Sequence, residues 1–254
     1  MYRPRVIPCL LLKDKGLVKT IKFKDPTYVG DPMNAVKIFN DAKADELVFL
    51  DITATKENRI TDIGVIRNIG EEAFMPFAVG GGINSLEHVS QLISAGAEKV
   101  VINTACVNNP SLLTEASKIY GRQSIVASID VKKEGGEYRV YTNSGKVRSS
   151  SNAAEAAQRA EAAGAGEIMI NSMDRDGMQE GYDIELIKLI CDAVSIPVIA
   201  VGGAGQYEHF EEAVSQGGAS AVAAGSLFVF IGRKRAVLIN YPDSDELQEM
   251  FAHE

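Results

Sequence analysis

Residues 76–105 read PFAVGGGINSLEHVSQLISAGAEKVVINTA, and residues 197–226 repeat the pattern as PVIAVGGAGQYEHFEEAVSQGGASAVAAGS. A shift of 121 residues superimposes eight identical positions, namely 76, 81, 82, 87, 88, 94, 96 and 101 of the first copy, and it also lays Glu46 on Glu167. Each copy is an apolar run, a glycine-rich turn, a helical pattern closed by glycine, and a second apolar run. The repeat predicts two half-barrels, roughly residues 1–122 and 123–254, fused into a single domain of residues 1–254.

Strand-like apolar runs alternate with helical patterns along the whole chain. The eight runs cover residues 5–12, 46–52, 76–79, 99–103, 124–131, 167–172, 197–201 and 220–224. Alternation of this kind indicates a parallel sheet, and eight such units in 254 residues predict an α/β (β/α)8 TIM barrel. A doubly wound open sheet is the alternative, but no GxGxxG motif follows the first strand.

Composition excludes several classes of protein. A hydrophobic content of 46% and a charged content of 24% rule out disorder, while a net charge of −8 argues against nucleic acid as a partner. The sequence shows no signal peptide and no run of 18 apolar residues, so no membrane association is expected. The widely spaced cysteines (Cys9, Cys106, Cys191) favour a reducing, cytoplasmic setting. The histidines (His88, His209, His253) lack ligand spacing, so neither a metal nor an organic cofactor is predicted.

Glycine clusters end the third and seventh predicted strands, just before helices. Glycine lets backbone N–H groups approach an anion, and a helix N-terminus favours negative charge. Tight turns alone are the alternative explanation for these glycines. Because the clusters recur in both halves beside small polar residues, we expect two phosphate cradles and a ligand with phosphates near both ends. The cradle residues are Gly81, Gly82, Asn103 and Thr104 in the first half, and Gly203, Gly205, Gly225 and Ser226 in the second.

An acid stands at the end of the fifth predicted strand. Asp130 is a candidate general acid/base, although an aspartate there can also cap the next loop. A shift of 119 residues sets Leu11 opposite Asp130, so a symmetric second acid is missing. The basic segment 12–30, which includes Lys19, is either a lid over an anionic substrate or a solvated loop. A hairpin over residues 133–142 leads to Ser144, and Asp176 lies in an acidic turn after the sixth strand; both are candidate substrate-binding residues.

Charged residues begin four strands at the other end of the barrel. Arg5, Glu46, Lys99 and Glu167 share the side-chain parity that faces the lumen, so they predict a neutral ring closing its floor. Burying such a ring is costly unless the charges pair with one another, and solvated strand ends are the alternative.

The sequence resembles the cyclase subunit of imidazole glycerol phosphate synthase over essentially its whole length. The resemblance rests on RVIPCL at 5–10, DELVFLDITA at 45–54, VGGGI at 79–83, INTA at 102–105, SMDRDG at 172–177 and GGAG at 202–205. It implies a partner glutaminase, docked on the N-terminal face of the barrel, whose ammonia passes through the barrel to a bisphosphate substrate. Arg5, Glu46, Lys99 and Glu167 would then form the ammonia gate, Asp130 a catalytic acid, and Lys19 a residue that closes over the substrate.

Leu11 departs from the family, which uses an aspartate there together with the Asp130 position. The run CLLL at 9–12 and the segment KFKDPTYVGDP at 22–32 look more like a paralogous branch linked to surface polysaccharides. That branch implies conversion of an acetamido to an acetamidino group on a nucleotide sugar. The sequence AAGSL at 223–227 also departs, so the second cradle is expected to hold a different group, such as a pyrophosphate. The alternatives are the histidine-pathway cyclase, with Asp14 or a substrate phosphate replacing the missing acid, and a non-catalytic activator of a glutaminase.

Overall fold

Eight parallel strands close into a barrel in the computed structural model, which describes residues 3–232 and 234–252. Each strand pairs with its neighbours, the last with the first, so the predicted (β/α)8 barrel is confirmed and the open sheet is excluded. In order around the barrel the strands are β1 (Arg5–Lys13), β4 (Leu47–Asp51), β5 (Phe77–Gly80), β6 (Lys99–Ile102), β7 (Ile125–Glu134), β10 (Glu167–Ser172), β11 (Val198–Val201) and β12 (Ala221–Ala224).

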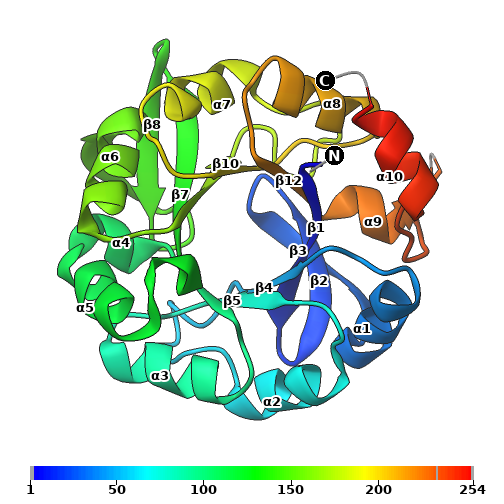
Figure 1. Ribbon diagram of the computed structural model, residues 1–254, viewed down its shortest axis with the longest axis horizontal. Helices are drawn as coiled ribbons and strands as arrows, with labels where there is room; N and C mark the ends of the chain where they lie inside the picture. The colour runs from blue at the N-terminus through cyan, green and yellow to red at the C-terminus, as the bar shows by residue number, and fades with distance from the viewer. Residues whose placement is uncertain (1–2, 233, 253–254) are drawn as a thin grey trace.

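Helices surround the barrel as an outer ring (Figure 1). Their apolar faces and the outward-facing strand residues form the main core, which includes Phe39, Phe210 and Phe228. Side-chain caps start several of them: Asp31 accepts hydrogen bonds from two N–H groups of the first turn of α1, with Pro32 following. The helices are α1 (Pro32–Asp41), α2 (Ile63–Glu72), α3 (Leu86–Ser94), α4 (Thr104–Asn108), α5 (Ser111–Tyr120), the 3-10 turn η1 (Arg122–Ser124), α6 (Ala153–Ala163), α7 (Ile184–Cys191), α8 (Glu208–Ser215), α9 (Ser226–Val229) and α10 (Ser244–Met250).

A second, smaller apolar cluster fills the barrel lumen. Successive side chains of a strand point to opposite faces, so every second residue faces inward. The inward-facing apolar residues are Ile7, Cys9, Val48, Ala78, Val101, Val126, Met169, Ile199, Ala221 and Ala223, with Leu50 and Val201 packed against them. The same parity puts Arg5, Glu46, Lys99 and Glu167 below this cluster and Leu11, Asn103, Asp130 and Asn171 above it.

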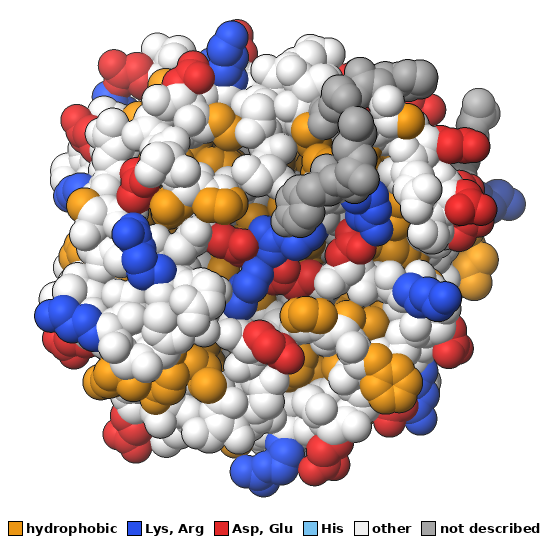
Figure 2. All heavy atoms as spheres, viewed as in Figure 1, with side chains coloured by type: hydrophobic (Ala, Val, Ile, Leu, Met, Phe, Trp, Pro, Cys, Tyr) orange, Lys and Arg blue, Asp and Glu red, His pale blue; other side chains and the backbone are white. Residues whose placement is uncertain are grey.

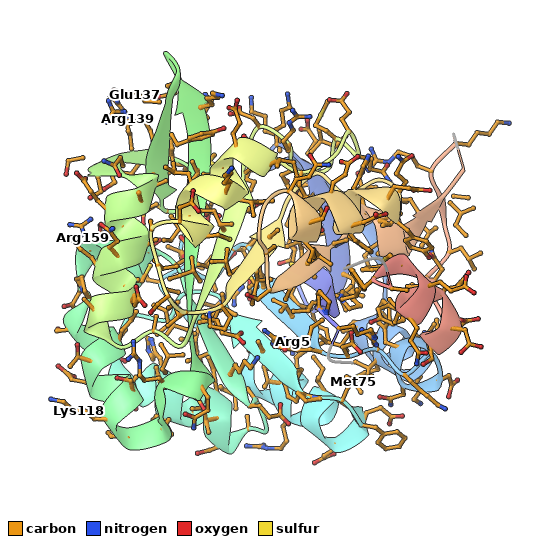
Figure 3. All side chains as sticks on the ribbon, turned by 45° about the horizontal axis from the view of Figure 1, so that its top comes forward. Arg5, Met75, Lys118, Glu137, Arg139 and Arg159 are labelled. Atoms are coloured by element: carbon orange, nitrogen blue, oxygen red, sulfur yellow. The ribbon has the colours of Figure 1, made fainter. Side chains whose placement is uncertain are left out.

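Two antiparallel extensions rise from the barrel, one after β1 and one after β7. They are β2 (Gly16–Ile21) with β3 (Lys24–Gly30), and β8 (Glu137–Thr142) with β9 (Val147–Asn152); a small pair, β13 (Phe230–Ile231) and β14 (Ala236–Val237), follows α9. The predicted hairpin at 133–142 is confirmed, and Figure 3 shows its labelled residues Glu137 and Arg139 projecting from the body.

The segment 12–30, expected to be a loop, is instead a paired hairpin, and its role as a lid stays a prediction. Its two-residue turns use Asp14 and Lys15, then Lys22 and Phe23, all with positive φ. Such turns are normally marked by Asn or Gly, so the usual sequence signal is missing here. None of the helices in the described residues has the length and apolar character that a bilayer crossing needs.

Candidate active site

A closed ring of ion pairs forms the floor of the barrel. Arg5 contacts Glu46 through Nη1 and reaches Glu167 through Nη2 at 2.6 Å. Opposite, Lys99 Nζ lies 3.0 Å from both carboxylate oxygens of Glu46 and 3.1 Å from Glu167. Each of the four charges therefore has two partners of opposite sign. Burial alone would lower the pKa of Arg5, but Glu167 and Glu46 raise it above its usual value.

This ring is not a set of solvated strand ends, because the Glu46 side chain is only 4% exposed. Figure 2 shows basic and acidic side chains meeting at the centre of this face, and Figure 3 places the labelled Arg5 in the middle of the same end. Directly above the ring lies the apolar lumen. The floor is thus a layer of paired charges beneath an apolar interior.

Asp130 lies at the top of the lumen and is clamped by two amides. Asn103, at the end of β6, donates from Nδ2 to Asp130 Oδ2 over 3.0 Å, and Asn171 of β10 donates to Oδ1 over 3.2 Å. Burial raises the pKa of Asp130 to about 7, against the opposing effect of the two amide donors. A carboxyl group with this pKa exchanges protons readily near neutral pH, which suits a general acid/base.

Leu11 lies on β1, across the barrel from β7, and is paired in register with Leu50 of β4. It places an apolar side chain where the resemblance described above implies a second acid. Asp14 is exposed in the turn that joins β1 and β2, and its use as a replacement acid stays a prediction. Asp130 is therefore the carboxylate that these strands bring to the centre of the mouth.

Lys19 is buried rather than poised on a mobile loop. Only 6% of Lys19 is exposed, and its Nζ donates to the Cys9 carbonyl over 2.5 Å. Burial lowers the pKa of Lys19, while Cys9 and Asp176 oppose that shift. The amine lies against Gly225, where a Cβ would collide with it. The structure thus brings together Lys19, Gly225 and the adjoining Ser226 at the end of β12, and the solvated-loop alternative is wrong for this residue.

Asp176 holds the tip of the β2–β3 hairpin. Its carboxylate accepts from the Thr20 hydroxyl at 3.2 Å and from the Phe23 N–H at 3.4 Å, and its carbonyl accepts from the Lys22 N–H at 2.9 Å. Burial raises the pKa of Asp176. Its observed role is to hold the hairpin, and substrate contact stays a prediction.

Thr104 contacts the turn that contains Ser144, at a different part of the mouth. The hydroxyl of Thr104 accepts from the Asn143 N–H over 3.0 Å, which anchors the turn that contains Ser144. The next residue, Gly145, packs against Phe23 and Met173. The turn after β8 therefore lies against the tip of the β2–β3 hairpin, so both extensions border the mouth.

The first glycine cluster is enforced by close packing. A Cβ on Gly81 would lie 2.7 Å from Thr61 Oγ1 and 2.8 Å from Asp51 Cβ, and one on Gly82 would overlap the Arg59 carbonyl. Asp51 holds this loop in place by accepting from Arg59 Nη1 at 2.5 Å. Packing alone therefore explains these two glycines, and phosphate binding at this turn stays a prediction.

The second cluster is packed in the same way against the loop that follows β10. Cβ atoms on Gly203 and Gly205 would overlap the carbonyls of Gly181 and Gln179. Gly203 also has a φ of +122°, a conformation that L side chains rarely adopt. The tight-turn explanation covers these positions as well, so phosphate binding here too stays a prediction.

Asn171 is a further residue of the candidate site, which the sequence motifs did not single out. Its spacing of four residues from Glu167 places it on the lumen face, which was the available signal. Its contact with Asp130 depends on the register between β10 and β7, in which the two residues are direct neighbours. Within residues 3–232 and 234–252, no three His, Cys, Asp or Glu side chains gather as a metal-ligand group. His253 lies outside the described residues.

The chain is similar to one known protein family and to individual proteins over most of its length. Residues 5–232 match the family described as "Histidine biosynthesis protein". A protein of Pseudomonas aeruginosa named "Putative imidazole glycerol phosphate synthase subunit hisF2" is 50% identical over 97% of this chain and 99% of its own. "Imidazole glycerol phosphate synthase subunit HisF" of Hydrogenobaculum sp. is 47% identical over 91% of this chain and 92% of its own. The chain therefore belongs to the histidine biosynthesis protein family, in which it groups with the HisF-type proteins.

Proposed function

We propose that this chain is the synthase subunit of a two-protein glutamine amidotransferase. A glutaminase docks at the strand-start end and releases ammonia, which passes the ion-pair ring and the lumen to a phosphate-bearing substrate at the mouth. The observation that carries the proposal is the order of three features along the barrel axis. A ring of paired charges lies at the bottom, an apolar lumen in the middle, and a buried carboxyl group at the top. An apolar lumen suits neutral ammonia, because it offers no charge to retain it.

Two further observations support a partner at the strand-start end. The relatives are named as subunits. Phe74, in the loop just before β5, is 88% exposed, and a large apolar side chain in water favours a protein contact. The partner and the passage of ammonia are tested together with glutamine labelled with ¹⁵N in its amide, the purified chain and its glutaminase. Appearance of ¹⁵N in the substrate supports the proposal, whereas release of all the label as free ammonia contradicts it.

For the reaction itself, the names of the relatives favour formation of imidazole glycerol phosphate from a bisphosphate precursor. In this reaction Asp130 transfers protons at the reacting ring, without a second carboxylate on β1. Complementation of a histidine auxotroph tests it directly. Growth that depends on Asp130 supports this reaction, and failure of the wild-type chain to restore growth contradicts it.

Leu11 favours a second candidate, the conversion of an acetamido to an acetamidino group on a nucleotide sugar. A leucine cannot exchange protons, and loss of one acid/base group typically slows a reaction about 10²–10⁴-fold. Incubation of the two-protein complex with a nucleotide-linked acetamido sugar and labelled glutamine decides between the candidates by mass spectrometry. If glutamine hydrolysis is stimulated while neither probe changes mass, the chain acts as a non-catalytic activator instead.

A further inference from the structure

The carboxamide oxygen of Asn171 is a buried acceptor without a donor. In the described part of the chain, two buried side-chain polar atoms lack a hydrogen-bond partner, and the other, Arg139 Nε, belongs to the projecting hairpin. Buried polar groups are nearly always hydrogen-bonded in folded proteins, because an unpaired one loses its interactions with water and gains nothing. An orphaned acceptor beside the proposed catalytic acid therefore indicates a ligand that donates.

Asn103 provides an internal comparison. Both amides donate from Nδ2 to the carboxylate of Asp130, one to each oxygen. The Asn103 oxygen accepts from the Thr104 hydroxyl at 3.4 Å, whereas the Asn171 oxygen has no such neighbour. Clamping Asp130 thus needs only the N–H side of each amide, and the free oxygen of Asn171 is an additional feature.

Gly202, at the end of β11, packs directly against this oxygen. A Cβ on Gly202 would lie 2.7 Å from Asn171 Oδ1, so any other residue at position 202 would displace it. Two residues before Asn171 on the same strand face, Met169 lines the lumen. The amide of Asn171 is therefore placed just above the apolar lumen, with its nitrogen on the carboxylate of Asp130 and its oxygen against Gly202.

We propose that Asn171 Oδ1 and Asp130 form a binding site for ammonium at the upper end of the lumen. The inference rests on the proposed function and adds a holding point for the nitrogen that the lumen delivers. Ammonium donates on every side and accepts from none, so two acceptors on neighbouring strands match it. Ammonia arriving from the lumen is a stronger base than the Asp130 carboxylate, so it takes the proton of protonated Asp130 and becomes ammonium beside the ionised carboxylate. The same proton returns to Asp130 when the nitrogen lone pair is freed to react.

Site-specific ¹³C NMR of the Asp130 carboxyl carbon tests this without any turnover. The signal is assigned by its absence in Asp130→Asn, and its titration is compared in ammonium chloride and potassium chloride at equal ionic strength. An ammonium ion bound beside the carboxylate favours the ionised form, so the pKa of Asp130 should be lower by about 1 in ammonium than in potassium.

Asn171→Ala and Asn103→Ala form a matched pair, since each removes one donor to Asp130. The ammonium-specific lowering should persist in Asn103→Ala and disappear in Asn171→Ala. If Asn171→Ala does not fold, Asn171→Val provides a β-branched substitute suited to a central strand. Persistence of the full effect without Asn171, or no ammonium-specific effect in the wild-type chain, overturns the site.

This readout separates the site from the proposed function. Loss of the ammonium effect together with intact transfer of ¹⁵N from glutamine rejects the holding point alone. An ammonium effect that depends on Asn171, combined with no transfer to any substrate, supports the site and rejects the synthase role.

Discussion

The side-chain amide of Asn103 reaches Asp130 Oδ2 at 3.0 Å and the Ser128 carbonyl at 3.2 Å. One nitrogen thus ties the end of β6 to two levels of β7 and fixes the orientation of the carboxylate. Because Asp130 is buried, its charged form is disfavoured despite the amides, and its pKa rises to about 7. The amide that orients the Asp130 carboxyl group therefore lies in the same buried environment that raises the pKa of this group.

Asp130→Asn should remove most of the activity of the complex. The amide is nearly isosteric but cannot transfer a proton, so we expect kcat to fall about 10²–10⁴-fold. The measurement is ¹⁵N transfer from glutamine to substrate, with glutamine hydrolysis by the partner as the control for assembly. Wild-type transfer by the variant would contradict a proton-transfer role for Asp130.

The contribution of Asp130 to the free energy of unfolding should fall as pH rises from about 4 to about 7, because the folded chain holds a proton on Asp130 that the unfolded chain has released. The pKa difference corresponds to about 4 kcal/mol at most. The raised pKa of Asp176 acts in the same direction. Urea unfolding across this range should show a smaller pH-dependent loss for Asp130→Asn than for wild type. If the free energy of unfolding depends on pH equally in the two proteins, the raised pKa of the buried Asp130 is contradicted.

Lys99→Met should destabilise the fold and disturb the ring. It removes two of the ion pairs around Glu46 and Glu167, which are mostly buried, and breaking such pairs costs about 3 kcal/mol. Lys15→Met is the matched control, because the Lys15–Asp62 pair at 3.3 Å is exposed and should contribute less than about 1 kcal/mol. Chemical unfolding measures both variants. Similar losses would show that the ring behaves as a surface feature.

Gly82→Ala should cost at least about 3 kcal/mol, since the new Cβ overlaps the Arg59 carbonyl and must displace that loop. Gly135→Ala separates this clash from backbone strain. Gly135 also has a positive φ, of +58°, but nothing lies within 4 Å of its would-be Cβ, so only about 1 kcal/mol is expected. Equal destabilisation of the two variants, measured by thermal unfolding, would mean that close packing does not dictate the glycine at position 82.

Leu11→Asp tests what the missing acid means for the reaction. A carboxylate on β1 across the mouth supplies the second acid that the resemblance implies, and we expect it to raise the rate of imidazole glycerol phosphate formation. Leu11→Asn, with similar size and polarity but no acid, should not. An equal gain from both would assign the effect to polarity. No gain from Leu11→Asp would show that the missing second acid does not by itself limit the rate of imidazole glycerol phosphate formation.

Local periodicity determined much of this protein before any coordinates. Alternation with a period of two placed Arg5 and Lys99 on the inner face, and the structure brings them into one ring with Glu46 and Glu167. Asp130 was identifiable for the same reason, since an acid that ends a buried strand must lie at the mouth of a barrel.

The tertiary structure alone decided how these elements meet. The neighbouring positions of Asn171 and Asp130 follow from the register of two strands far apart in sequence, which closure of the barrel sets. Lys19 is buried because the segment after β1 folds as a hairpin whose turns carry Lys22 and Phe23 at positive φ, without the usual glycine signal. The side-chain parity of a strand depends on that strand alone. The register between strands and the packing of a hairpin depend on segments far away in the sequence, so the local sequence does not determine them.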